Sequence, residues 1–307
     1  MILSCGEALI DMLPRQSPAG EAAFAPHAGG SVFNTAIALG RLGARAGFLS
    51  GISTDLFGAM LIETLAASGV DAGLSIRSDR PTTLAFVKLV DGHASYAFYD
   101  ENTAGRMISP EDLPALPAEV TALFFGGISL PVEPCGNTYE ALMTRAAATR
   151  ITMLDPNIRP GFIRDAAAYR ARLARMIALA DIVKLSDEDL RWLEGPGEIA
   201  ALARGLLARG PKLIFVTEGS NGAHAFNAEL SLFEPAHRVH VVDTVGAGDT
   251  FNAGVLAALD RAGRLTKAGI ATADAALMSA CLKLGNAAAA ITVSRAGANP
   301  PWAEELK

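Results

Sequence analysis

The stretch 243-DTVGAGDTF-251 places two glycines and an alanine directly before an aspartate, and the apolar run 251-FNAGVLAAL-259 follows. This pattern predicts a glycine loop that opens a helix near Asp249. Backbone N–H groups at a helix start are unpaired, and the helix adds about half a positive charge there. The loop is therefore typical of an anion site, although it carries an anion of its own.

The loop matches neither common nucleotide fingerprint. No Gly-Lys-Ser/Thr follows it, and Gly246-x-Gly248 has no third glycine at the dinucleotide spacing. The residues favour a group transfer to a hydroxyl, in which Asp249 takes the proton of the alcohol and the N–H groups stabilise the moving phosphoryl group. The alternative is that Asp249 is only a helix N-cap.

Upstream of this loop, β-like and α-like segments alternate. Apolar runs predict buried strands at 121–127, 150–155, 181–186 and 212–217, and helical patterns occupy 165–180 and 197–210. This alternation predicts a mostly parallel sheet with helices on both faces. The segment 223–242 departs from it and predicts short antiparallel strands with a turn near Asn227-Ala228.

The first third of the chain has a different pattern. Residues 12–28 are polar and loop-like, and two β-like runs flank Asp91-Gly92, which is a hairpin signal. No helical pattern separates these runs. We expect one domain over residues 1–307, with a discontinuous β-structured lid from about 12–28 and 81–103.

Composition argues against several classes of function. The 307 residues carry a formal net charge of −6 and no block of five Lys/Arg, so nucleic acid and anionic membranes are not expected partners. The three cysteines lack metal-site spacing, which argues against zinc and a disulfide framework. Without a signal-peptide pattern or a long uncharged apolar run, a cytoplasmic setting is expected.

A second glycine-rich stretch, 28-AGGSVFNTAIALGRLG-43, also leads into a helix. Its helix start and Asn34 suit the hydroxyl groups of a polyol, although a plain tight turn at Gly29-Gly30 is an equal alternative. Open parallel sheets bind ligands beyond the carboxyl ends of their strands. The other candidates at such ends are Asp11 and the segments 155–159, 184–189 and 217–219.

Together, 29-GGSVFNTA-36 and 243-DTVGAGDTFNAG-254 resemble the two signatures of the phosphofructokinase-B (ribokinase-like) sugar kinase family, in order and spacing, over essentially the whole chain. The resemblance implies a ribokinase-like three-layer α/β/α sandwich with a mostly parallel central sheet and a small β-structured lid. It also implies ATP-dependent phosphorylation of the primary hydroxyl of a neutral sugar.

The resemblance implies a role for each matching residue. The base is Asp249, and the anion hole is the backbone of Gly246, Ala247, Gly248 and Asp249. The sugar contacts are Asp11, Gly29, Gly30, Asn34, Phe98, Asn157 and Arg159. For Arg159 the alternative is a salt bridge to Asp155 or Asp165. The nucleotide contacts are Lys184, Thr217, Gly219, Gly222 and Asn286.

Metal ions are implied at two places. Ser186-x-x-Asp189 stands where the family pattern is Asn-x-x-Glu, which organises Mg²⁺ through water, and both positions depart from that pattern. Some members bind K⁺ near the position of Asp243 and the closing loop within 285–298. The lid of such proteins often forms a homodimer contact.

Within the family, the chain is most similar to fructokinases, on the segments 6-GEALIDM-12, 81-PTTLAFV-87, 98-FYDENTAG-105 and 155-DPNIRP-160. Where many of these have arginine after the Phe-Tyr pair, this chain has Asp100, whose charge disfavours a phosphorylated or carboxylated sugar. The expected reaction is fructose to fructose 6-phosphate.

Several alternatives stay open. The acceptor in one set is ribose, 2-keto-3-deoxygluconate or a nucleoside. A sugar or nucleotide sensor without catalysis is disfavoured by the intact Asp249. A dinucleotide oxidoreductase lacks its fingerprint after the first strand.

Overall fold

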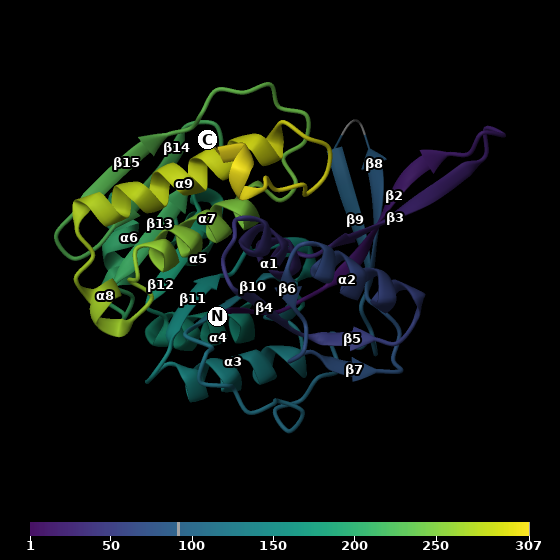
Figure 1. Cartoon of the computed structure of the whole chain (residues 1–307), viewed down its shortest axis with the longest axis horizontal. Helices are drawn as coiled ribbons and strands as arrows, with labels where there is room; N and C mark the ends of the chain where they lie inside the picture. The colour runs from purple at the N-terminus through teal and green to yellow at the C-terminus, as the bar shows by residue number, and fades with distance from the viewer. Residues whose placement is uncertain (91–92, 307) are drawn as a thin grey trace.

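A nine-stranded sheet forms the centre of the molecule in the computed structural model, which describes residues 1–90 and 93–306 (Figure 1). Its strand order is β15-β14-β13-β12-β11-β10-β1-β4-β6. The strands are β1 (Ile2–Cys5), β4 (Ala46–Leu49), β6 (Val70–Asp71), β10 (Ala122–Gly126), β11 (Ile151–Asp155), β12 (Ile182–Ser186), β13 (Leu213–Thr217), β14 (Gly222–Phe226) and β15 (Ser231–Pro235). All pair in parallel except β14 and β15, which are antiparallel.

Helices cover both faces of this sheet and make the predicted three-layer sandwich. The helices are α1 (Ser31–Arg41), α2 (Leu56–Ala67), α3 (Cys135–Ala146), α4 (Ala166–Leu179), α5 (Asp187–Glu194), α6 (Ile199–Leu207), α7 (Ala247–Arg261), α8 (Lys267–Ala271) and α9 (Ala275–Val293). Short 3-10 turns occupy Gly127–Ser129, Pro160–Phe162 and Ala303–Leu306. One hydrophobic cluster joins the sheet to α1, α2, α7, α8 and α9, and a second joins it to α3, α4, α5 and α6.

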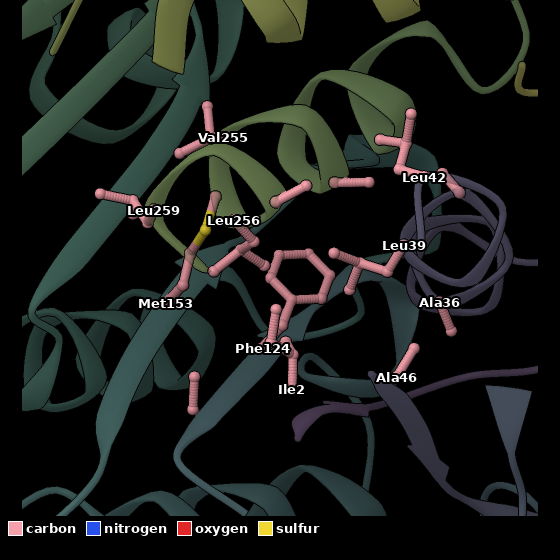
Figure 2. Packing of buried hydrophobic residues seen from close by; sticks show 14 of the residues in the cluster. Ile2, Ala36, Leu39, Leu42, Ala46, Phe124, Met153, Val255, Leu256 and Leu259 are labelled. Carbon is pink, nitrogen blue, oxygen red and sulfur yellow. The ribbon is translucent and has the colours of Figure 1, made fainter. Parts of the chain in front are cut away.

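Alternation along each buried strand supplies both clusters. In β10, Phe124 belongs to the first cluster, whereas Leu123 and Phe125 belong to the second. Figure 2 shows Phe124 between Leu256 of α7 and Leu39 of α1. The two helices that carry the glycine signatures are thus fixed against the same strands.

The two segments predicted to form the lid lie in a separate four-stranded sheet in the order β3-β2-β8-β9. Its strands are β2 (Leu9–Gln16), β3 (Ala22–Gly29), β8 (Leu84–Val90) and β9 (His93–Tyr99), and a small sheet pairs β5 (Gly51–Ser53) with β7 (Ile76–Ser78). Residues 12–16 and 22–28 are therefore strand and not loop, with a turn at 17–21 between them, and they are polar because they are at least partly exposed. The predicted turn at Asp91-Gly92 lies outside the described residues.

The predicted elements of the central sheet are confirmed. Strands β10, β11, β12 and β13 and helices α4 and α6 fall within the predicted ranges. In 223–242, β14 and β15 flank a turn in which the Asn227 side chain accepts the N–H groups of Glu229 and Leu230. Residues 236–242 add no strand, so the antiparallel part of that prediction ends at Pro235.

Helix α9 is long and apolar enough to cross a membrane by length and composition. Half of its apolar stretch is buried inside the protein, and its residues Met278 and Leu282 belong to the same cluster as α7. This is the placement of a core helix.

Candidate active site

The glycine loop opens α7 as the sequence predicts. Gly246 is the N-cap in a left-handed conformation with φ 79°, and a Cβ there would lie 2.7 Å from the Cβ of Ala298. The first-turn N–H groups of a helix have no intrahelical acceptor. Ala247 directs its N–H to the carbonyl of Thr244 at 3.4 Å, which leaves Gly248 and Asp249 as the better donors for an anion.

The Asp249 side chain joins the two signature motifs. Its Oδ2 accepts a hydrogen bond of 2.9 Å from Nδ2 of Asn34, 215 residues away in α1. Thr35 Oγ1 also donates to the main-chain carbonyl of Asp249 at 3.2 Å. Because Gly246 is the cap and Asp249 bonds to another helix, the N-cap alternative is wrong.

Burial sets the protonation of this carboxyl. Asp249 is 6% exposed, and desolvation raises its pKa to about 7. The Asn34 hydrogen bond lowers the pKa, the charge of Asp155 raises it, and the charges of Lys184 and Arg159 lower it. A carboxyl with a pKa near neutrality is suited to accept and release a proton.

A buried polar network lies beside the anion site. Asp155 Oδ2 accepts from Nζ of Lys184 at 3.0 Å and from Nδ2 of Asn252 at 2.7 Å. A Cβ on Gly248 would lie 3.0 Å from that Nζ, so the ammonium group lies next to the start of α7. Lys184, predicted as a nucleotide contact, is therefore held by Asp155 close to the glycine loop. Sequence reasoning missed Asn252, because it is a single polar residue inside the apolar run 251–259.

The predicted sugar residues near the start of α1 lie together. Asp11 is inside β2, and a Cβ on Gly29 would lie 2.3 Å from its Oδ2. Gly30 caps α1 with φ 109°, and a Cβ there would lie 2.9 Å from the carbonyl of Glu7. Burial raises the pKa of Asp11 to about 6. Asn34 follows one turn later and reaches Asp249.

Glu7 is a buried carboxyl that sequence reasoning missed. Its Oε1 accepts from the N–H of Ser31 at 2.9 Å and from Oγ of Ser31 at 2.7 Å, at the first residue of α1. Within residues 1–90 and 93–306, its buried Oε2 has no hydrogen-bond partner, and desolvation raises the pKa of Glu7. Glu7 and Asp11 both lie in the segment 6-GEALIDM-12, from which the sequence analysis identified Asp11 but not Glu7.

The remaining sugar candidates lie along the lid and the segment after β11. Phe98 meets Phe162 edge-on with ring centroids 5.0 Å apart. Asn157 has φ 44° and donates its N–H to Oδ1 of Asp155 at 3.1 Å. Arg159 is exposed and donates to the carbonyl of Ile158.

The salt-bridge alternative for Arg159 is wrong. Asp155 is paired with Lys184, and Asp165 caps α4 by accepting the N–H of Ala168. Arg159 is left at the site as an exposed charge that lowers the pKa of Asp249.

The expectation drawn from Asp100 needs correction. Its carboxylate is buried and forms an ion pair of 2.9 Å with Arg106. It therefore does not present an unbalanced negative charge, because the guanidinium of Arg106 cancels it.

The predicted nucleotide residues lie around β13, β14 and β15. Thr217 ends β13, and Gly219 follows with φ 52°. A Cβ on Gly222 would lie 2.2 Å from the carbonyl of Glu234, and Asn286 donates to that carbonyl at 3.0 Å. Gly222 and Asn286 therefore both contact the main chain at the end of β15, in addition to any contact with a nucleotide.

The candidate metal residues are also tied into the fold. Ser186 caps α5 by accepting the N–H of Asp189 at 3.0 Å, and Oδ1 of Asp189 accepts the N–H of Ile158 at 3.1 Å. The oxygens of Asp243 accept the N–H groups of Val245 and Gly297. The described part of the chain has no group of three or more His, Cys, Asp or Glu placed to hold a metal.

Comparison with known proteins identifies the family of the chain. The model of the pfkB family carbohydrate kinases matches residues 1–305. A fructokinase from Rhizobium leguminosarum bv. trifolii is 56% identical over 274 residues, 89% of this chain and 84% of that protein. The crystal structure of a fructokinase with bound ATP from Xylella fastidiosa has a TM-score of 0.89 at 30% identity, covering 99% of this chain and 96% of that one.

A second solved structure is an aminoimidazole riboside kinase from Salmonella enterica, complexed with aminoimidazole riboside and an ATP analog. It has a TM-score of 0.85 at 26% identity, and the match covers 99% of this chain and 97% of that one. The fold is therefore that of the sugar kinases.

Proposed function

The chain belongs to the pfkB family of carbohydrate kinases, and from this premise we propose that it phosphorylates fructose to fructose 6-phosphate with ATP. The observation that carries the proposal is the hydrogen bond between Asn34 and Asp249, because it supports a site in which the proposed sugar contact and the proposed base act together at the start of α7. The named fructokinase relative supports the choice of sugar.

In this reaction the 6-hydroxyl oxygen forms a bond to the γ-phosphorus as the bond from phosphorus to the β,γ-bridging oxygen breaks. Asp249 accepts the hydroxyl proton, and Asn34 holds the carboxylate in place. The N–H groups of Gly248 and Asp249 stabilise charge on the transferring group. Lys184, fixed by Asp155 behind Gly248, adds positive charge beside it.

The sugar is placed by Asp11, Gly29, Gly30 and Asn34, with Phe98, Asn157 and Arg159 at its sides. We place ATP along the carboxyl edge of the sheet, with its phosphates at Gly246, Ala247 and Gly248. The residues on the base and ribose side are Thr217, Gly219, Gly222 and Asn286.

Mg²⁺ fits beside Asp189. Burial and, to a smaller extent, repulsion from Asp155 raise the pKa of Asp189, so a hydrated cation bound there would offset the cost of its negative charge. Ser186 and Asp189 would hold the ion through water, and the ion would neutralise phosphate charge when bound. A K⁺ ion beside Asp243 and the closing loop is proposed from the carboxylate at that position.

We also propose a homodimer through the lid, in a cytoplasmic enzyme. The ring of Phe86 meets the rings of both Phe24 and Tyr99 edge-on, which makes a row of three aromatic side chains. Phe24 is 47% exposed and Tyr99 is 59% exposed. Aromatic side chains that remain exposed in a row are typical of a protein interface. This row lies on the face opposite to Asp11, since strand side chains alternate.

An assay of ADP release with a panel of acceptors tests the proposed function. The panel contains fructose, ribose, 2-keto-3-deoxygluconate and aminoimidazole riboside, each with Mg²⁺ and ATP. We expect fructose to give the highest kcat/KM. A kcat/KM for another acceptor about tenfold above that for fructose, a difference of about 1.4 kcal/mol in transition-state stabilisation, would overturn the substrate assignment.

A further inference from the structure

Asp100 and Arg106 form a buried ion pair in the wall of a cavity of about 200 Å³ at the lid. Their side chains are 9% and 17% exposed, and Nη1 of Arg106 lies 2.9 Å from Oδ2 of Asp100. Arg106 is fixed further by donating from Nε to the carbonyl of Glu133 at 3.1 Å. The other lining residues are Phe98, Val132, Gly161, Phe162 and Arg164.

A row of residues across the lid sheet connects the proposed sugar site to this cavity. Asp11 of β2 is in register with Ala85 of β8, which is in register with Phe98 of β9. Residues in register share one face of a sheet, and neighbouring strands are about 4.8 Å apart. Phe98 therefore lies about 10 Å from Asp11, close to the length of an extended hexose.

The ion pair makes this wall electrically neutral. An unpaired guanidinium with this degree of burial is costly, and a neighbouring carboxylate removes most of that cost. The second arginine of the cavity, Arg164, pairs with Glu101 at the surface, where both side chains are about 70% exposed. A carboxylated sugar would therefore find no unpaired cation in this wall to balance its charge.

We propose that the Asp100–Arg106 pair sets the acceptor class of the enzyme. It selects uncharged sugars by cancelling, within the cavity, a cation that otherwise binds the carboxylate of a six-carbon sugar acid. This inference rests on the proposed function and deepens it. Asp100 acts through Arg106, so it is a specificity residue and takes no part in the chemical step.

The variant Asp100→Asn tests this with 2-keto-D-gluconate, which is fructose with its C1 carbinol oxidised to a carboxylate and its 6-hydroxyl intact. In the variant, Arg106 is free to bind that carboxylate. The ratio of kcat/KM for 2-keto-D-gluconate to kcat/KM for fructose is expected to rise about 30-fold, the factor given by a charge-assisted hydrogen bond of about 2 kcal/mol. An unchanged ratio overturns the proposal.

Two controls separate this pair from general surface charge. Glu101→Gln removes the neighbouring carboxylate and frees the exposed Arg164, and it should leave the ratio unchanged. The double variant Asp100→Asn with Arg106→Gln removes both charges and should lose the gain. An equal gain in either control overturns the proposal.

Thermal unfolding gives a second readout that does not depend on catalysis. Asp100→Asn should melt at a lower temperature than wild type, and formate or 2-keto-D-gluconate should restore its melting temperature by supplying the missing charge. A variant indifferent to both anions overturns the proposal. Wild-type enzyme inert towards fructose would contradict the proposed function instead, and the anion-dependent melting of Asp100→Asn would still decide this proposal.

Discussion

Asp249 and its partners show which single residues a sequence can reveal. The glycine loop and Asp249 are adjacent in sequence, so local pattern was enough to predict both. Asn252 and Glu7 were missed because their partners, Asp155 and Ser31, are distant in sequence and are brought close only by the fold. The Asp100–Arg106 pair could not be predicted either, since an acidic residue does not reveal its partner.

The pH dependence of kcat/KM is the first prediction at this scale. Asp249, with a pKa of about 7, must be deprotonated to act as a base, so kcat/KM should fall as pH drops through that value. Asn34→Ala removes a hydrogen bond that lowers this pKa, so the acid limb should move to higher pH. The measurement is kcat/KM against pH.

Thr35→Val is the matched control for Asn34→Ala. Thr35 lies next to Asn34 but donates to the main-chain carbonyl of Asp249, so its loss should not move the acid limb. An acid limb that stays in place in Asn34→Ala, or moves equally in both variants, would argue against the hydrogen bond as a pKa determinant.

The stability of Asp249→Asn is a second prediction at the residue scale. The folded-state pKa of about 7 is raised above the ordinary aspartate value of 3.8, so Asp249 lowers stability progressively as pH rises between these values. The difference of about 3 pKa units corresponds to about 4 kcal/mol. The variant should therefore melt above wild type at about pH 8, and the gain should shrink as pH is lowered.

Circular dichroism melts of both proteins across this pH range measure the effect. A difference in melting temperature between wild type and variant that is the same at every pH would contradict this prediction. It would show that ionisation of Asp249 does not destabilise the folded protein.

At the scale of elements, α1 and α7 do most to assemble the site. Each begins at a glycine with positive φ, Gly30 and Gly246, and Asn34 and Thr35 of α1 both hydrogen-bond to Asp249 of α7. The sequence predicts both helices from their glycine starts and apolar periodicity. The lid strands within residues 12–28 were harder to predict, because partly exposed strands away from the core lack a continuous apolar run.

Glu7 is predicted to fix the start of α1. Glu7→Ala removes both hydrogen bonds to Ser31, so the helix carrying Gly30 and Asn34 should shift. We expect a lower melting temperature together with a higher KM for fructose. Steady-state kinetics and thermal melts of the same preparation check this.

Asp165→Ala is the control, because Asp165 caps α4 away from the site through the N–H of Ala168. Loss of that cap should lower stability by about 1 kcal/mol without changing KM. If Glu7→Ala resembles this control in every kinetic parameter, Glu7 has no role in positioning α1.

The whole molecule is a nine-stranded α/β/α sandwich with a second, four-stranded sheet at its side. The parallel part was predictable because strands buried on both faces are mostly apolar, and β10 to β13 keep this pattern despite Lys184 inside β12 and Asp155 at the end of β11. The sequence predicted that the segments carrying β2, β3, β8 and β9 belong together, but it did not predict how their strands pair. The parallel pairing of β2 with β8 depends on contacts between residues far apart in the sequence.

The association of two copies through the lid is the prediction at this scale. Phe24→Asp places a charge in the exposed aromatic row of the lid and should convert a dimer into a monomer. Phe233→Asp is the matched control, because Phe233 is 49% exposed but lies in β15, at the far edge of the central sheet. Light scattering after gel filtration measures the mass, and dimers that persist in Phe24→Asp would exclude this interface.

Turnover by Asp249→Asn tests the central claim most directly. The substitution keeps the size of the side chain and its contact with Asn34 but removes the base. Fructose phosphorylation should fall by at least about 10²-fold, while calorimetry should show nearly unchanged ATP binding, because the backbone donors of the anion site remain. A turnover number within about tenfold of wild type would contradict the assignment of Asp249 as the base.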